Sequence, residues 1–273
     1  MNDDAIAPVV AVMMILVVAV TLLSIWNAIY LPDLKQQAEM EHLEEVENSF
    51  VNIDESIRKM VLFQSEGELT ESVTLGGGDI MLHQAKSGGV LSIHKYPSAI
   101  VTVKNATSPL YEAFMIENIS YTPSSNFWLN QGYEWRDGII NVTKGTNSVP
   151  RFYVDVSEAK NKGEDRWFNT VRIQDNGETG IGFILINITV ADPLSISGNG
   201  IAHIEMDGEL SEKIELTNPV DLTIDTSTGL WGKTNETVSK LLKGSGYSYT
   251  HPGKYQINKK VNLTLYNLTL SVR

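Results

Sequence analysis

The feature that most constrains this chain is an apolar segment close to its N-terminus. No charged residue lies between Asp4 and Asp33, and most residues from Ile6 to Leu31 are hydrophobic. A helix needs roughly 20 such residues to cross the hydrocarbon core of a bilayer. We therefore expect residues 6–31 to form a helix that is able to span a membrane.

An ordinary cleaved secretory signal does not fit this segment. Such signals begin with basic residues, have an apolar core of about 7 to 15 residues and end at a small-x-small cleavage site. Here the leader Met1-Asn2-Asp3-Asp4 has no Lys or Arg, and the only Ala-x-Ala motif, Ala5-Ile6-Ala7, precedes the apolar segment. We therefore expect the mature protein to keep this helix.

A second helical pattern follows the apolar segment directly. Between Leu34 and Leu62, large apolar residues recur at intervals of three and four, which places them in one stripe: Leu43, Val46, Phe50, Ile53, Ile57 and Met60. No glycine precedes Gly67, so one helix over residues 6–64, kinked near Pro32, is expected. The stripe is expected to pack against the protein's own sheet, and a coiled coil is the alternative.

The other face of this helix is acidic, and we expect it to be solvated, with a charge-specific partner site as the alternative. Its acidic residues are Glu39, Glu41, Glu44, Glu45, Glu47, Asp54 and Glu55. Two pairs at i and i+4 have the favourable polarity, Asp54 with Arg58 and Glu55 with Lys59.

Residues 65–273 have the texture of an antiparallel β domain. Short alternating segments such as Val220–Ile224 are separated by turn signals, and Asp-Gly at 137–138 and 207–208 predicts two hairpins. A surface helix is expected within 233–244, and a strand is expected at 151–156. The fold class is therefore α+β: a leader (1–5), a long helix (6–64) and a sandwich-like β-rich globular domain (65–273).

Acceptor sequences for N-linked sugars are more frequent than chance predicts. Roughly three are expected from the composition, but the chain has Asn105, Asn118, Asn141, Asn187, Asn235, Asn262 and Asn267. All follow the apolar segment, so we expect glycosylation and an external β domain. In the last strand the apolar phase changes at Tyr266, which predicts a β-bulge there and places Asn262 and Asn267 on one polar face.

The segment DDAIAPVVAVMMILVVAVTLL resembles the N-terminal signature of archaeal type IV pilin-like proteins. In that family a prepilin peptidase cuts before the hydrophobic helix, and Asp4-Ala5 matches its charged-small site. The resemblance implies cleavage between Ala5 and Ile6. Ile6-Ala7-Pro8-Val9-Val10 matches the family's apolar-small-proline-valine start, and Val10 stands where bacterial pilins carry glutamate. YEWRDGIINVTKGTNSVPRF and GIGFILINITVADPL are also similar to segments of archaeal surface proteins in this class.

The resemblance also implies partners and a location. The helix would lie in membrane lipid, with the C-terminal domain outside the cell, until pilus assembly machinery packs it against the same helix of itself or other pilins. The chain is then expected to be a subunit of an archaeal type IV pilus or related surface filament, as a minor pilin or adhesin. The alternative is a non-polymerising, membrane-anchored cell-surface glycoprotein.

Charge and composition argue against several other functions. The 273 residues include 21 basic and 33 acidic ones, with a net charge of −12 and no cysteine. Nucleic acid is therefore a disfavoured partner, and thiolate chemistry is excluded. No nucleophile motif occurs, and no metal-site spacing occurs among His42, His83, His94, His203 and His251. We expect no enzymatic activity, no cofactor and no metal.

A third hypothesis is a membrane-tethered hydrolase or sugar-binding module. Sugar binding would use exposed aromatic side chains, for which the candidates are Trp128, Trp135, Trp167 and Trp231. Aromatic residues of a β domain are more often core residues, and that is the expectation for these four.

Overall fold

The computed structural model describes residues 6–77, 87–124, 129–136, 138–151, 171–175, 180–217, 219–224, 242, 247–251 and 253–273. Several predictions fall outside these ranges: the helix within 233–244, most of the strand at 151–156, the leader, His83, and the side chains of Asn235, Trp128, Trp167 and Trp231.

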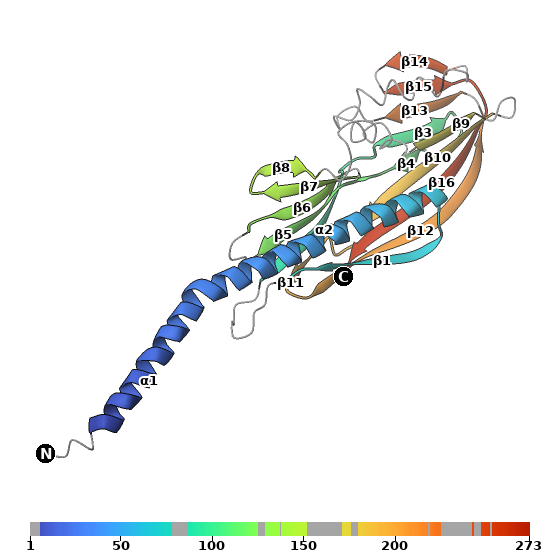
Figure 1. Ribbon diagram of the computed structural model, residues 1–273. Coiled ribbons are helices and arrows are strands. Elements are labelled where there is room, and N and C mark those ends of the chain that lie inside the picture. Colours follow the sequence, from blue (N-terminus) through green and yellow to red (C-terminus); the bar gives the residue numbers. More distant parts are fainter. Residues whose placement is uncertain are drawn as a thin grey trace.

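One long helix begins the described part of the chain, as predicted (Figure 1), and its exposed apolar part, residues 6–30, is called the rod below. The long helix consists of α1 (Ile6–Ile25), a π-helical turn (Trp26–Tyr30) and α2 (Leu31–Phe63). In the π turn the N–H of Leu31 donates to the carbonyl of Trp26, five residues back. Pro32 has no N–H, and its ring conflicts with a regular turn before it, so the wider turn accommodates it. The long helix changes direction at this point in Figure 1, which agrees with the predicted kink.

The described strands form three sheets (Figure 1). In the first sheet the order is β1 (Gly67–Thr74), β12 (Ile201–Leu216), β16 (Val261–Val272), β10 (Ile181–Val190), β9 (Val171–Asp175). In the second sheet it is β11 (Ser195–Gly198), β2 (Gly88–Lys95), β5 (Ile116–Ser124), β6 (Gly132–Arg136), β7 (Ile139–Lys144), β8 (Asn147–Pro150). In the third it is β14 (Tyr247–His251), β15 (Lys254–Ile257), β13 (Val220–Ile224), β3 (Val101–Asn105), β4 (Tyr111–Ala113).

Nearly all described strand neighbours are antiparallel, and the exception is the parallel pair of β10 and β16. A long apolar helix followed by a mostly antiparallel β-rich domain confirms the α+β class. The strand predicted from the alternation at Val220–Ile224 is β13, and its apolar side chains Val220, Leu222 and Ile224 are buried.

Helix α2 forms part of the domain core. The six residues of its predicted stripe are between 0 % and 4 % exposed: Leu43, Val46, Phe50, Ile53, Ile57 and Met60. They share one apolar cluster with Met206 and Leu268 of the first sheet and with Leu91 and Ile119 of the second. The stripe is therefore a seam within the protein's own core, as expected.

The last strand changes its buried face without a bulge of its own. Leu263 of β16 belongs to the cluster shared with the third sheet, whereas Leu268 belongs to the cluster around α2. Pairing with β10 continues without a shift along β16. The apolar phase changes because the covering layer passes from one face of the sheet to the other.

The predicted bulge in the last strand is therefore wrong. The extra residue is Ser211 of neighbouring β12, where pairing passes from Leu210–Tyr266 to Glu212–Leu265. Because side chains alternate along the continuous β16, Asn262 and Asn267 point to opposite faces and do not share one polar face.

One of the two predicted hairpins is present and the other is wrong. Gly138, with φ +77°, lies between β6 and β7, which pair as a hairpin. Asp207-Gly208 instead lies inside β12, paired with both β1 and β16. Glycine is required at 208 for close approach: a Cβ there would lie 2.3 Å from the Tyr266 hydroxyl and 2.3 Å from the Ser65 carbonyl oxygen. Asp207-Gly208 therefore resembles a turn sequence only because close packing requires glycine at position 208.

Candidate functional site

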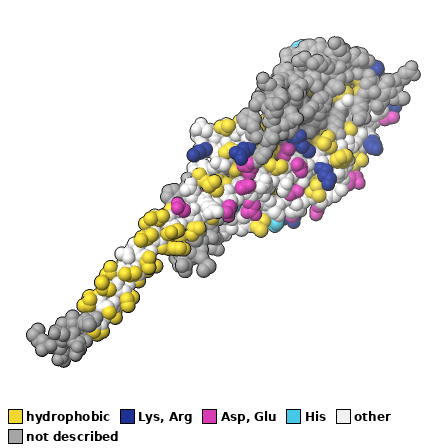
Figure 2. Space-filling model, in the orientation of Figure 1, with side chains coloured by type: hydrophobic (Ala, Val, Ile, Leu, Met, Phe, Trp, Pro, Cys, Tyr) yellow, Lys and Arg dark blue, Asp and Glu magenta, His cyan; other side chains and the backbone are white. Residues whose placement is uncertain are grey.

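The most conspicuous surface feature is the bare apolar rod (Figure 2). The large hydrophobic side chains between Val9 and Tyr30 are 47–69 % exposed. A helix of 25 residues is about 37 Å long, which exceeds the roughly 30 Å hydrocarbon core of a bilayer. By length and composition this helix is able to cross a membrane.

The polar side chains in the rod are satisfied within the helix. Thr21 and Ser24 donate to the carbonyls of Val18 and Val20, each over 2.8 Å, and Asn27 donates to the Leu23 carbonyl over 3.0 Å. Such back-bonding leaves few polar groups to be desolvated in apolar surroundings. At the end of the rod the rings of Trp26 and Tyr30 stack at 5.7 Å, the position that interfacial aromatic residues occupy on spanning helices.

The head is the β-rich domain together with α2, and where the rod enters it, polar residues of α2 contact the second sheet and the segments that flank its strands. Glu39 accepts a hydrogen bond from the Leu129 backbone N–H over 3.1 Å. Further along, Glu47 accepts from the Tyr133 hydroxyl over 3.0 Å and pairs with Arg151 at 3.0 Å. The expected solvated face is therefore wrong for these residues, because Glu39 is 3 % and Glu47 is 6 % exposed.

The remaining acidic residues of α2 behave more nearly as expected. Glu41, Glu44, Glu45 and Glu55 are exposed, and Thr74 donates to Glu45 over 3.0 Å. The predicted Asp54–Arg58 ion pair forms at 2.7 Å. Glu55 and Lys59 are both exposed, and within the described residues no ion pair joins them.

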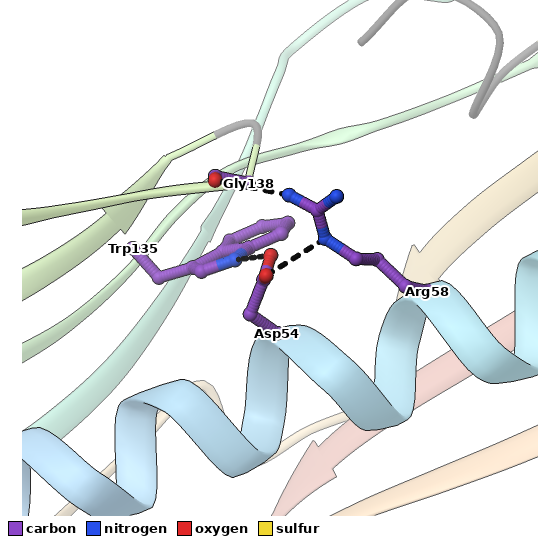
Figure 3. Close-up of polar contacts among 4 residues, drawn as sticks. All are labelled: Asp54, Arg58, Trp135 and Gly138. Carbon is purple, nitrogen blue, oxygen red and sulfur yellow. Dashed lines mark hydrogen bonds and ion pairs between the residues drawn. The ribbon is translucent and has the colours of Figure 1, made fainter. Parts of the chain in front are cut away.

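Asp54 connects α2 to the β6–β7 hairpin (Figure 3). One carboxylate oxygen accepts from the indole N–H of Trp135 over 2.8 Å, and the other accepts from Nε of Arg58. Arg58 in turn donates from a terminal nitrogen to the Gly138 carbonyl over 3.2 Å. The carboxylate thus joins α2 to β6, and Arg58 extends the connection to the turn between β6 and β7. Trp135 is a core residue, only 4 % exposed.

We expect Asp54→Ala to lower the free energy of unfolding of the head by about 2–4 kcal/mol. The change leaves the indole N–H and the guanidinium without their acceptor in a partly buried site. Urea unfolding of the detergent-solubilised chain measures the loss. Glu55→Ala, on the exposed side of the same turn, is the matched control and should change stability by less than about 0.5 kcal/mol. Equal effects of the two changes would contradict this role of Asp54.

His42 is a buried ionisable residue of α2, 5 % exposed, one turn from Glu39. Its Nε2 lies 3.0 Å from the Tyr121 hydroxyl oxygen, and this hydroxyl donates its own proton to the Leu75 carbonyl over 3.0 Å. The proton between His42 and Tyr121 is therefore on Nε2, and the imidazole donates to the hydroxyl oxygen. Burial lowers the pKa of His42, although the carboxylates of Glu45 and Glu39 act in the opposite direction. The neutral imidazole therefore supports the packing of α2.

Tyrosine hydroxyls at this interface stay protonated at neutral pH. Burial raises the pKa of Tyr121, and burial together with the hydrogen bond to Glu47 raises the pKa of Tyr133 to about 12. Burial also raises the pKa of Tyr266 to about 12, and its hydroxyl donates to the Ser65 carbonyl. Tyr133 thus donates to Glu47 of α2, Tyr121 accepts from His42 of α2 and donates to the Leu75 carbonyl, and Tyr266 donates just beyond the end of α2.

Sequence reasoning missed these partners of α2. Glu47 and Tyr133 are 86 residues apart, and Asp54 and Trp135 are 81 apart. The spacing of two acidic residues was one available signal. Glu47 and Asp54 are seven residues apart, so they lie on the same side of the helix, next to the apolar stripe. Side chains that border a buried stripe can reach the sheet that covers it.

The predicted sugar-acceptor sites are spread over the sheets. Those within the described residues each have a half-buried asparagine on a strand: Asn105, Asn118, Asn141, Asn187, Asn262 and Asn267. Asn187 and Asn267 are direct neighbours on β10 and β16. Of the predicted cleavage site, Ile6 begins α1 and Ala5 lies outside the described residues, so cleavage there stays a prediction.

The ionisable side chains do not assemble into a metal centre in the described part of the chain. No group of three or more His, Asp or Glu residues there could hold an ion. Beside α2, a groove is lined by Met40, Glu44, Glu47, Tyr133 and Arg151, among others. Glu47 in this groove already binds Tyr133 and Arg151, so its carboxylate has a structural role.

Comparison with known proteins gives no match over this chain, whether to protein-family models, to curated proteins or to solved structures. The function is therefore inferred from the N-terminal pattern and from the geometry described above.

Proposed function

We propose that this protein is a pilin-like subunit of an archaeal type IV pilus or related surface filament, as a minor pilin or adhesin. The observation that carries the proposal is the division of one continuous helix into two parts. The α1 part is bare and apolar, whereas the α2 part is enclosed in the head. A pilin needs a free rod for the filament core and a separate folded head on the same helix.

The rod is chemically suited to two apolar surroundings. It has no charged side chain between Ile6 and Leu31, and its polar groups bond to its own backbone. In the proposal, a prepilin peptidase cuts between Ala5 and Ile6, the rod waits in the lipid, and assembly machinery exchanges lipid for the rods of neighbouring pilins. No buried charge has to be neutralised during this exchange.

The head would remain outside the cell throughout. In the proposal it is a sandwich-like domain in which the first and second sheets enclose α2. Hydrogen bonds between α2 and the rest of the head fix the direction in which the rod leaves the head. They join Glu39 with Leu129, Glu47 with Tyr133 and Asp54 with Trp135. A fixed exit direction is useful to a subunit that must pack its rod in register with others.

The alternative, a non-polymerising anchored surface glycoprotein, is favoured by one observation. The exposed rod is apolar on all sides, without a stripe of distinct chemistry that would select a partner helix. A helix that is hydrophobic all round is equally typical of a simple membrane span.

Mechanical shearing of intact cells tests the proposal. Filaments released by shearing are separated from membranes by centrifugation, and the chain is measured in both fractions by quantitative mass spectrometry. We expect it in the filament fraction, co-sedimenting with other pilins. Its confinement to the membrane pellet, while filaments of other subunits are released, would favour the anchored glycoprotein instead.

A further inference from the structure

The predicted sugar acceptors differ in whether their amide nitrogen is engaged. Attachment of a sugar takes place at Nδ2 of asparagine, so the surroundings of this atom decide whether a folded head presents it. Five of the six described sites divide into two groups by this criterion, and the sixth, Asn267, is engaged through Oδ1 alone, by the amide of Asn187.

Asn118, on the outer side of the second sheet, is engaged on both amide atoms. Its Nδ2 donates to a carboxylate oxygen of Glu134 on β6 over 2.8 Å. Its Oδ1 accepts from Nδ1 of His94 on β2, also over 2.8 Å. The side chain of Glu134 is only 14 % exposed and also pairs with Arg136. Withdrawing the Asn118 amide would therefore leave a poorly solvated carboxylate without one of its donors.

Asn187, in the first sheet, is also engaged on both amide atoms. Its Nδ2 donates to Oδ1 of Asn267 over 3.1 Å, and its Oδ1 accepts from the Phe114 backbone N–H over 3.0 Å. The threonines of the same two acceptor sequences, Thr189 and Thr269, are joined by a hydrogen bond of 3.2 Å. The two acceptor sequences thus bind each other across the parallel strands.

Asn105 is held in a similar way at the end of β3. Its Nδ2 donates to the Thr217 carbonyl over 3.1 Å, and its Oδ1 accepts from the backbone N–H groups of Thr107 and Ser108. This asparagine therefore fixes the turn that follows β3.

Asn141 and Asn262 contrast with these three. Within the described residues neither side chain has a hydrogen-bond partner. Asn141 lies opposite Glu134 on one side and Pro150 of the short, exposed strand β8 on the other. Asn262 lies between Glu215 and Gly182, and the glycine has no side chain to cover it. Each amide nitrogen is free to react without loss of a contact that supports the sheet.

We infer that Asn141 and Asn262 are the sites at which the folded head receives N-linked sugar, and that Asn105, Asn118 and Asn187 are structural amides that remain unmodified. The inference rests on the external location of the head in the proposed function. The co-reactant is a lipid-linked sugar phosphate. A bond forms between Nδ2 and the anomeric carbon, the bond from that carbon to the phosphate oxygen breaks, and one amide proton leaves with the lipid phosphate.

Glycopeptide mass spectrometry of the chain from its own cells tests the inference. We expect sugar at Asn141 and Asn262, with occupancy at Asn105, Asn118 and Asn187 lower by about tenfold or more, because each of these must first break its hydrogen bonds. Equal occupancy at Asn118 and Asn141 overturns the inference.

A gain of modification sharpens the test. Glu134→Ala removes the acceptor that holds Asn118 and should raise the occupancy at Asn118 to that of Asn141. Glu134→Gln keeps an acceptor oxygen in the same place and should leave Asn118 unmodified. Occupancy at Asn262, in a different sheet, is the internal control for folding and export. An unchanged Asn118 in the Ala variant, with Asn262 still modified, contradicts the inference.

The same digest separates this inference from the proposed function. A native chain that begins at Ile6 but carries no sugar overturns the acceptor sites and leaves the pilin-like proposal intact. A chain that begins at Met1 and carries sugar at Asn141 and Asn262 supports the acceptor sites and contradicts the pilin-like proposal.

Discussion

A chain that lacks residues 1–30 should fold into a soluble head, whereas a chain that lacks residues 1–65 should not fold. The first deletion removes only residues 1–5 and the exposed rod. The second also removes the six-residue stripe of α2, whose members are at most 4 % exposed. Burial of each such side chain contributes roughly 1.5–3 kcal/mol, so the loss is at least about 9 kcal/mol, comparable with the whole stability of a domain.

The two deletions are compared by circular dichroism, size-exclusion chromatography and thermal unfolding. The 31–273 chain is expected to be monomeric and to unfold cooperatively, and the 66–273 chain is expected to aggregate or to show no cooperative transition. Phe50→Ala in the 31–273 chain provides a graded control, with an expected loss of about 3–5 kcal/mol. A cooperative transition of the 66–273 chain at an unchanged midpoint would refute the view that α2 completes the core.

Periodic patterns in the sequence predicted the helical part well. The stripe from Leu43 to Met60 is set by spacing along one helix, and tertiary packing then buries the same residues. The kink near Pro32 followed from the missing N–H of proline, which is a local property. The hairpin at Gly138 was also predictable, because its turn depends on a backbone conformation that glycine provides.

Features that depend on distant neighbours were not predictable in the same way. Asp207-Gly208 has the composition of a turn, but the absence of a side chain at Gly208 serves contacts with Ser65 and Tyr266. The change of apolar phase at Tyr266 is compatible with a bulge or with a change of covering layer, and only the pairing with β10 decides between them. A single strand holds no information about which layer covers it.

The candidate site shows the same division. The apolar rod is evident from composition, because most positions between Ile6 and Leu31 are hydrophobic and none is charged. The buried roles of Glu39 and Glu47 depend on Leu129, Tyr133 and Arg151, which are far away in the chain. The acceptor sequences identify asparagines, but the hydrogen bonds that distinguish Asn118 from Asn141 come from neighbouring strands.

We expect cleavage of the leader to depend on a small residue at position 5. The resemblance to archaeal pilin-like proteins places a small residue at Ala5, directly before the cut. Replacing it with a bulky residue, Ala5→Phe, is expected to leave the leader attached in nearly all molecules. Asn2→Ala, in the same leader but away from the cut, is the matched control and should be processed as the native chain is.

The central claim is that the apolar helix is retained after the five-residue leader is removed, and the N-terminal peptide of the native chain tests it most directly. Lys35 is the first basic residue, so trypsin releases the whole rod as one peptide that ends there. Its mass in protein from native membranes or filaments is expected to correspond to Ile6–Lys35. A peptide that begins at Met1, or a mature chain that begins after the rod, would contradict the account.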